Sequence, residues 1–176
     1  MKVPIEQLAE ELSRLCPPAP GAPEPSPAPA EGEAPQPAAP APPPPCQIVD
    51  FARRGVHLDV AVLADKVVAA AEILDAHGFG MDCVTGVDWM ADGQMEGVYD
   101  YFDPEGPWRV AVRARIPRDN PEIQTVSEVF PGANWHERET HDFFGIRFLG
   151  HPDLSPLLLP EDADFHPLRK DYAPQP

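Results

Sequence analysis

The stretch WRVAVRARI, residues 108–116, alternates apolar and polar side chains along its length. An alternation with a period of two is typical of a β-strand with one face on a core and the other in water. The inward set is Val110, Val112, Ala114 and Ile116, and the outward set is Arg109, Ala111, Arg113 and Arg115. The stretch therefore predicts a half-buried strand.

Two further strands are expected before it, near residues 80–88 and 96–102. Consecutive strands joined by short turns form an antiparallel meander. Upstream, residues 55–60 alternate as another strand, and residues 64–76 have the apolar periodicity of a helix, with Gly78 at its C-terminal end. This order predicts an α+β fold: a small mixed, largely antiparallel sheet with flanking helices and an extended C-terminal tail.

The N-terminal quarter of the chain has a different composition. Apolar residues from Ile5 to Leu15 recur at helical spacing, which predicts an amphipathic helix that needs a partner surface. Residues 17–45 hold more than half of the chain's 26 prolines, so no packed core can form there. This tract is either a ligand for a proline-binding module or a semi-rigid tether, and we expect the tether.

The chain is thus predicted to have four parts. They are an amphipathic helix (1–16), a Pro/Ala-rich disordered insertion or linker (17–45), an α+β domain (46–145) and an extended partner-binding tail (146–176). No periodicity is visible after Gly145, and the leucines and aromatic residues of the tail cannot bury themselves alone. We expect the tail to lie on its own domain or on a partner. Before that tail, Asn134 is expected to cap the helix that follows it.

The formal net charge of −16 argues against nucleic acid as a partner and against direct binding to an anionic membrane. No apolar run is long enough to span a bilayer, and the N-terminus lacks the apolar core of a signal peptide. These features indicate a cytoplasmic chain. Cys16, Cys46 and Cys83 are too few and too widely spaced for a disulfide framework or a metal-ligand set, so we expect three unpaired thiols.

Residues 134–172, NWHERETHDFFGIRFLGHPDLSPLLLPEDADFHPLRKDY, are unusually dense in charged, aromatic and turn residues. We call them the C-terminal segment and expect them to carry the function. His136 and His141 are five positions apart and face different sides of a helix, so no zinc site is predicted. The sequence also lacks a phosphate-binding loop, a dinucleotide fingerprint and a nucleophile elbow, so we expect no catalytic or cofactor-binding residues.

Two pairs four residues apart, Glu137–His141 and Arg138–Asp142, are predicted on this helix. They leave two alternatives open: a recognition helix with aromatic anchors, or a self-paired helix in solvent. His151 and His166 each precede a proline, where a histidine that bonds nearby backbone is commoner than a proton shuttle. The small basic island Arg169-Lys170-Asp171 fits either charge-steered docking or an ordinary solvated tail.

The C-terminal segment closely resembles the signature of the 30-kDa subunit family of respiratory complex I, the bacterial NADH-quinone oxidoreductase. The matching residues are Glu137-Arg138-Glu139, Asp142, Phe143-Phe144 and His151, with supporting likeness at Gly86-Val87-Asp88-Trp89, Ala133-Asn134-Trp135 and Pro167 to Tyr172. Ser155 stands where the family pattern has an arginine. The resemblance covers residues 47–172 and implies that residues 17–45 are an insertion after the first helix.

The resemblance implies a cofactor-free, architectural subunit of the peripheral arm of a proton-translocating NADH:quinone oxidoreductase, on the cytoplasmic face of the bacterial inner membrane. Its implied partners are the 49-kDa-type quinone-site subunit and the iron–sulfur subunits of the connecting module, while FMN, iron–sulfur clusters and quinone lie on other subunits. It would meet the membrane only through those partners. The alternative is the same part in a group 4 [NiFe] hydrogenase, formate hydrogenlyase or F420H2 dehydrogenase complex.

The residues expected at the subunit interface belong to the C-terminal segment. They are Trp135, Glu137, Arg138, Glu139, Asp142, Phe143, Phe144, His151, Arg169, Lys170 and Asp171.

Overall fold

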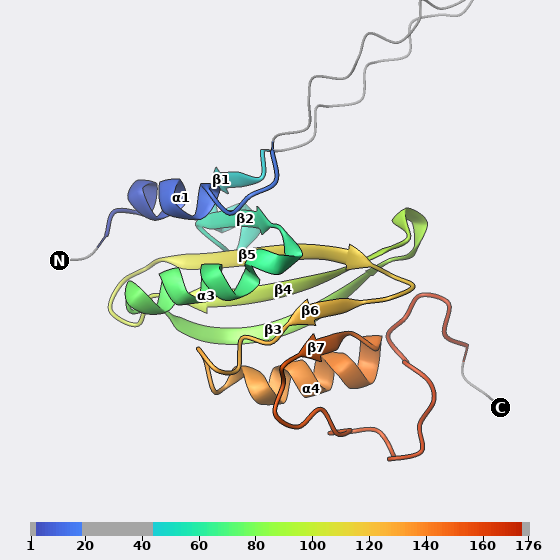
Figure 1. The fold of residues 1–176 in the computed structure, drawn as a ribbon. Helices are drawn as coiled ribbons and strands as arrows, with labels where there is room; N and C mark the ends of the chain where they lie inside the picture. Colours follow the sequence, from blue (N-terminus) through green and yellow to red (C-terminus); the bar gives the residue numbers. More distant parts are fainter. Residues whose placement is uncertain (1–2, 19–43, 174–176) are drawn as a thin grey trace, which may run out of the picture.

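The computed structural model describes residues 3–18 and 44–173, and its centre is a five-stranded sheet (Figure 1). The strands are β1 (Cys46–Ile48), β2 (Leu58–Val62), β3 (Gly80–Trp89), β4 (Gln94–Phe102) and β5 (Arg109–Pro117). Their order is β1-β2-β5-β4-β3, with β2 and β5 parallel and the other neighbours antiparallel. The predicted α+β fold and the β3–β4–β5 meander are confirmed.

Helices and a small second sheet surround this main sheet. The helices are α1 (Ile5–Ser13), α2 (Phe51–Arg54), α3 (Val67–Ala76) and α4 (Ala133–Phe144), with 3-10 turns η1 (Ala64–Lys66) and η2 (Met90–Asp92). The second sheet pairs β6 (Glu122–Gln124) with β7 (Arg147–Leu149) in parallel. In Figure 1, α3 lies in front of the main sheet, between α1 at the β1 end and α4 at the β3 end. None of the helices in the described ranges has the length and apolar character of a membrane span.

One hydrophobic core joins these helices to the sheet. Ile5, Leu8 and Leu12 of α1 are at most 4% exposed and pack into the same cluster as the inward residues of β2 and β5. Helix α1 therefore finds the partner surface that its sequence requires within its own chain. Residues 19–43, which hold most of the predicted Pro/Ala-rich tract, lie outside the described residues.

Strand β5 shows why the meander forms. Its four predicted inward residues, Val110 to Ile116, are all at most 2% exposed. Ala111, which the alternation assigns to the outward set, is also buried. It pairs with Asp59 of β2 and Asp100 of β4, and a methyl group between these longer side chains is covered even on the outer face.

The outer face of the sheet carries ion pairs. Arg113 bonds Asp59 at 2.7 Å, and Arg115 bonds Glu96 at 3.3 Å. The Arg115 guanidinium also lies 4.3 Å from the centre of the Trp89 ring. These contacts satisfy the charges that the outward set places on this face.

One prediction about local structure is wrong, and the structure adds elements that the sequence does not predict. Helix α4 begins at Ala133 after an N-cap at Gly132, so Asn134 lies inside the helix and does not cap it. Within the extended tail, residues 147–149 form β7 beside β6. The short elements β1 and α2 are missing from the sequence prediction, since three or four residues are too few to show a period.

Gly86 allows α4 to pack closely on β3. A Cβ atom added there would lie 2.6 Å from Cδ2 of Phe144, which is below any normal carbon–carbon contact. We expect Gly86→Ala to lower the free energy of unfolding by about 2 kcal/mol, measured by chemical denaturation. Gly132→Ala is the control, because its Cβ meets nothing within 4 Å and should change stability little. Equal effects of the two substitutions would contradict this packing.

Candidate functional site

The C-terminal segment consists of α4 and the chain that returns along it. The two predicted pairs within the helix do not form: within the described residues, Glu137 and Arg138 both bond groups far away in the sequence. Asp142 likewise bonds the returning chain. These three residues therefore hold the segment in shape, and they do not form a self-paired helix face.

Glu137 is fully buried and anchors the turn that precedes α4. Its carboxylate accepts hydrogen bonds from the Val126 N–H, at 2.8 Å, and from the Thr125 hydroxyl. The His151 ring is also fully buried, with Nε2 3.9 Å from Oε2 of Glu137. Burial raises the pKa of Glu137 to about 7, and the two hydrogen bonds oppose this rise only in part.

Arg138 connects the helix to the turn around Ser155. Its guanidinium donates to the Ser155 carbonyl at 3.0 Å, to the Ser155 hydroxyl at 3.1 Å and to the Pro156 carbonyl at 3.1 Å. The same guanidinium lies 5.4 Å from the centre of the Trp135 ring. Ser155, the position that departs from the family pattern, thus provides two of the acceptors that hold Arg138.

Asp142 anchors the middle of the returning chain. Its Oδ2 accepts hydrogen bonds from three successive backbone N–H groups, those of Leu157, Leu158 and Leu159, at 2.9, 2.7 and 3.1 Å. Burial alone would raise the pKa of Asp142, but these three bonds outweigh it and hold the pKa below its ordinary value. The carboxylate therefore stays charged and pins this turn to α4.

The end of the segment is held by a second carboxylate, Asp88 of β3. Arg118 bonds both oxygens of Asp88, at 2.8 and 3.0 Å, and the Lys170 N–H donates to the same group at 2.8 Å. Arg118 also pairs with Asp171 at 2.6 Å. The Arg118 guanidinium holds the pKa of Asp88 below its ordinary value, against the effect of burial. This network fastens residues 170–171 to the sheet.

The last turn of α4 needs glycine at position 145. Gly145 has φ of +73°, and a Cβ there would lie 2.5 Å from both Arg169 Nη2 and His166 Nε2. Arg169 uses its Nε to donate to the Phe144 carbonyl at 2.7 Å, and the Leu168 N–H donates to the Phe143 carbonyl at 3.1 Å. Arg169 is therefore a cap on the free carbonyls of the helix end.

Three of the four histidines of the segment bond backbone carbonyls. His141, His151 and His166 donate to Ile146, Asn134 and Asp142 at 2.9, 3.3 and 2.8 Å. This is the commoner of the two roles weighed for His151 and His166. Across residues 3–18 and 44–173, no group of three or more His, Cys, Asp or Glu side chains is placed to hold a metal ion.

Apolar side chains remain exposed on the outside of the segment. Trp135 is 61% exposed, Leu158 60% and Leu168 51%, and the rings of Phe165 and Tyr172 stack with centres 5.7 Å apart. Glu139 is also exposed on α4, whereas Phe143 and Phe144 are half-buried. The predicted site residues thus divide into an inner set, which holds the segment, and an outer set, which can meet another molecule.

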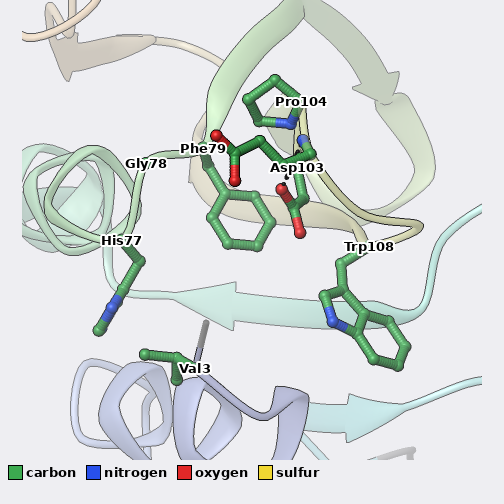
Figure 2. A pocket seen from close by; sticks show the side chains of 8 residues that line it. Val3, His77, Gly78, Phe79, Asp103, Pro104 and Trp108 are labelled. Carbon is green, nitrogen blue, oxygen red and sulfur yellow. Dashed lines mark hydrogen bonds between the residues drawn. The ribbon is translucent and has the colours of Figure 1, made fainter. Parts of the chain in front are cut away.

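A separate pocket lies outside this segment. It has a volume of about 250 Å³ and combines the aromatic rings of Phe79 and Trp108 with the carboxylates of Asp103 and Glu105. Figure 2 shows Val3 and His77 at its other side, near the start of α1 and the end of α3. None of its lining residues belongs to the C-terminal segment, and no motif in the sequence indicates it.

Sequence reasoning missed the role of Asp88 and Arg118. A signal was present: Asp88 continues the inward positions Val84 and Gly86 of its strand, where a charged residue requires a buried partner. The partner itself, Arg118, lies 30 positions further along the chain, so its identity could not be predicted from spacing.

Comparison with known proteins places this arrangement in a family. Residues 60–176 match the family described as the 30 Kd subunit of respiratory-chain NADH dehydrogenase, a range that contains the whole C-terminal segment. A subunit of the NADH-quinone oxidoreductase of Moorella thermoacetica is 37% identical over 123 residues, which cover 68% of this chain and 83% of that protein.

Two other relatives come from different complexes. A subunit of the F(420)H(2) dehydrogenase of Methanosarcina mazei is 47% identical over 90 residues, which cover 51% of this chain and 57% of that protein. A solved structure of the membrane-bound sulfane sulfur reductase, an archaeal respiratory membrane complex, contains a similar chain. That chain has a TM-score of 0.64 and 32% identity, with 74% of this chain and 78% of that one covered. The family match spans well over half of the sequence, and the chain therefore belongs to the family of the 30-kDa subunit of respiratory-chain NADH dehydrogenase.

Proposed function

We propose that the chain is an architectural subunit of the peripheral arm of a proton-translocating NADH:quinone oxidoreductase. The observation that carries this proposal is the family match over residues 60–176, because it includes both the inner and the outer residues of the C-terminal segment. The Moorella thermoacetica relative is named as part of an NADH-quinone oxidoreductase, which supports the same electron donor and acceptor class.

The build of the C-terminal segment supports a docking role. Asp142 and Asp88 fix the returning chain on α4 and the sheet, which limits the conformational entropy that binding would cost. Trp135, Leu158 and Leu168 remain exposed on this fixed frame, and such apolar anchors are typical of protein interfaces. We infer that they contact the 49-kDa-type quinone-site subunit and the iron–sulfur subunits of the connecting module.

In this proposal the redox centres lie on the partner subunits, and the chain itself is not catalytic. Its three cysteines are fewer than the four thiolates of an iron–sulfur cluster with four cysteine ligands. FMN, the iron–sulfur clusters and quinone would be carried by neighbouring subunits. The chain would sit on the cytoplasmic face of a bacterial inner membrane and reach that membrane only through its partners.

A second candidate is the equivalent part of a complex with another electron donor. The 47% identity to an F(420)H(2) dehydrogenase subunit and the likeness to a chain of the sulfane sulfur reductase favour it. The architectural role is the same in both cases, because it depends on the same segment. Only the neighbouring subunits, and hence the donor, differ.

Isolation of the tagged chain from its native host in mild detergent separates these candidates. Iron without nickel, together with NADH:quinone activity that quinone-site inhibitors abolish, is the expected result. Activity with reduced F420 in place of NADH, or nickel with hydrogen evolution, would favour the second candidate. A chain recovered alone, without any iron–sulfur subunit, would overturn both.

Trp135 is the residue at which docking can be tested without disturbing the fold. Because its side chain is 61% exposed, we expect Trp135→Ala to change the melting temperature by only about 1 °C. If Trp135 is an anchor of the interface, Trp135→Ala should weaken partner binding by roughly 30-fold or more. The measurement is the amount of partner subunits retained during isolation. Leu63→Ala, at an exposed apolar residue outside the segment, is the matched control. Full retention of the partners by Trp135→Ala would remove this residue from the interface.

A further inference from the structure

Cys16 and Cys46 are separated by the proline-rich tract in the sequence but meet in the fold. Cys16 follows α1 and Cys46 begins β1, and α1 packs on β1 and β2. The Cys16 Sγ lies 3.7 Å from the carbonyl oxygen of Pro45, and the Cys46 Sγ lies 3.4 Å from that of Ala9. The carbonyl that the Cys16 Sγ contacts belongs to Pro45, the residue directly before Cys46. The fold therefore places the two cysteines side by side, where the end of α1 meets the start of β1.

The surrounding backbone holds this arrangement in place. The Leu63 N–H donates to the Leu15 carbonyl at 3.3 Å, and the Ala61 N–H donates to the Pro45 carbonyl at 2.6 Å. Leu15 precedes Cys16 and Pro45 precedes Cys46. These hydrogen bonds therefore fix the backbone before each cysteine to the end of β2. Both thiols are free and half-buried, so a small reagent has access to them.

We propose that Cys16 and Cys46 form a dithiol site that a low-molecular-weight disulfide, such as oxidised glutathione, converts to an intramolecular disulfide. The bond would join the end of α1 to the start of β1 and close the covalent loop that contains residues 17–45. The disulfide would strengthen the attachment of α1 to the sheet. This inference does not depend on the proposed function.

The reaction balances as two exchange steps. The Cys16 thiolate attacks one sulfur of the small disulfide, whose S–S bond breaks and releases one small thiolate. The Cys46 thiolate then attacks the Cys16 sulfur of the mixed disulfide and releases the second. Two electrons pass from the cysteines to the small disulfide, and the two thiol protons end on the two small thiols.

The environment indicates which thiol reacts first. Burial raises the pKa of both thiols, that of Cys46 to about 11, while the neighbouring Cys46 group lowers that of Cys16. Cys16 is therefore the attacking group and Cys46 the resolving one. The exchange should be slow at neutral pH and become about tenfold faster with each unit that the pH rises toward these pKa values, since the thiolate is the nucleophile.

The test measures the equilibrium constant for formation of the Cys16–Cys46 disulfide by exchange with oxidised glutathione. The full chain is equilibrated with mixtures of reduced and oxidised glutathione, and the products are identified by peptide mass spectrometry. In the native protein we expect a constant about 100-fold larger than in concentrated guanidinium chloride, where the fold no longer holds the two thiols together. The Cys83→Ser variant should give the same constant, because Cys83 bonds Asp100 on the outer face of the sheet.

A second measurement checks the effect of the bond on the fold. The oxidised wild-type chain should melt roughly 10 °C above the reduced chain, and this difference should vanish in Cys16→Ser. Equal constants in native and denaturing conditions would overturn the proposal. So would stable mixed disulfides at Cys16 and Cys46, or a bond from either residue to Cys83.

Discussion

Asp142→Asn is expected to release the returning chain of residues 157–159 from helix α4. The single oxygen that now accepts three backbone N–H groups would lose its charge, and a charged acceptor contributes more than a neutral one to each bond. We expect a loss of about 3 kcal/mol in the local stability of this turn. The measurement is amide hydrogen exchange, in which the three leucine amides should exchange roughly 100-fold faster.

Asp153→Asn is the control for this substitution. Asp153 is exposed and accepts a hydrogen bond from the Ser155 N–H at 3.1 Å, but none from the leucine amides, so the substitution should change exchange at those amides little. If Asp142→Asn left those amides as protected as in the wild type, the turn would be held by other contacts. The inner set of the C-terminal segment would then need a different explanation.

The second large effect is a pH dependence that comes from Glu137. Burial raises the pKa of Glu137 in the folded chain to about 7, above its ordinary value of 4.5. The stability that belongs to its protonated form is present in full below about pH 4.5 and is lost as pH rises through 7. Over this window we expect the free energy of unfolding to fall by roughly 3 kcal/mol, measured by urea denaturation at a series of pH values.

Glu137→Gln should remove this slope. Glutamine can accept the Val126 N–H with its oxygen and donate to the Thr125 hydroxyl with its amide, as a protonated glutamate does. The variant should therefore be at least as stable as the wild type above pH 7. Glu139→Gln removes a similar but exposed charge from the same helix and should leave the slope intact. A slope that survives in Glu137→Gln would show that another group titrates.

Below the ordinary pKa of aspartate the direction reverses. The pKa values of Asp88 and Asp142 are held below 3.8 in the folded chain, so their stabilising bonds are lost as pH falls through that range. Stability should therefore pass through a maximum on the acid side of neutrality, at about pH 5. This maximum arises because the pKa of Glu137 is raised in the folded chain, whereas the pKa values of Asp88 and Asp142 are lowered.

The sheet is predictable because apolar side chains repeat along its strands. The β5 alternation is visible in the sequence because each inward residue is apolar, and burial of apolar area decides which face a strand presents. The elements β1, α2 and β7 carry no such signal, since they are too short to repeat. They form where neighbouring backbone offers partners, as Pro121 does for Arg147 at β7.

The sequence indicates residues 134–172 as the candidate site, but the bonding within this segment cannot be predicted from spacing. Spacing alone shows only partners within one helical turn, which is why it pairs Arg138 with Asp142. In the fold, Arg138 donates to the carbonyls of Ser155 and Pro156, and Asp142 accepts from the N–H groups of residues 157–159. Each side chain thereby makes several hydrogen bonds to the returning backbone, whereas an Arg138–Asp142 pair would give each only one partner. Trp135 is predicted as an interface residue from its residue type alone, and its side chain is exposed in the structure.

The measurement that tests the docking role of the C-terminal segment most directly is hydroxyl-radical footprinting of the isolated chain and of the purified complex. Trp135, Leu158 and Leu168 should be oxidised readily in the isolated chain, where they are more than half exposed, and protected in the complex. Oxidation of these three side chains at the same rate in both samples would show that the segment does not meet a partner, and the proposed docking role would be wrong.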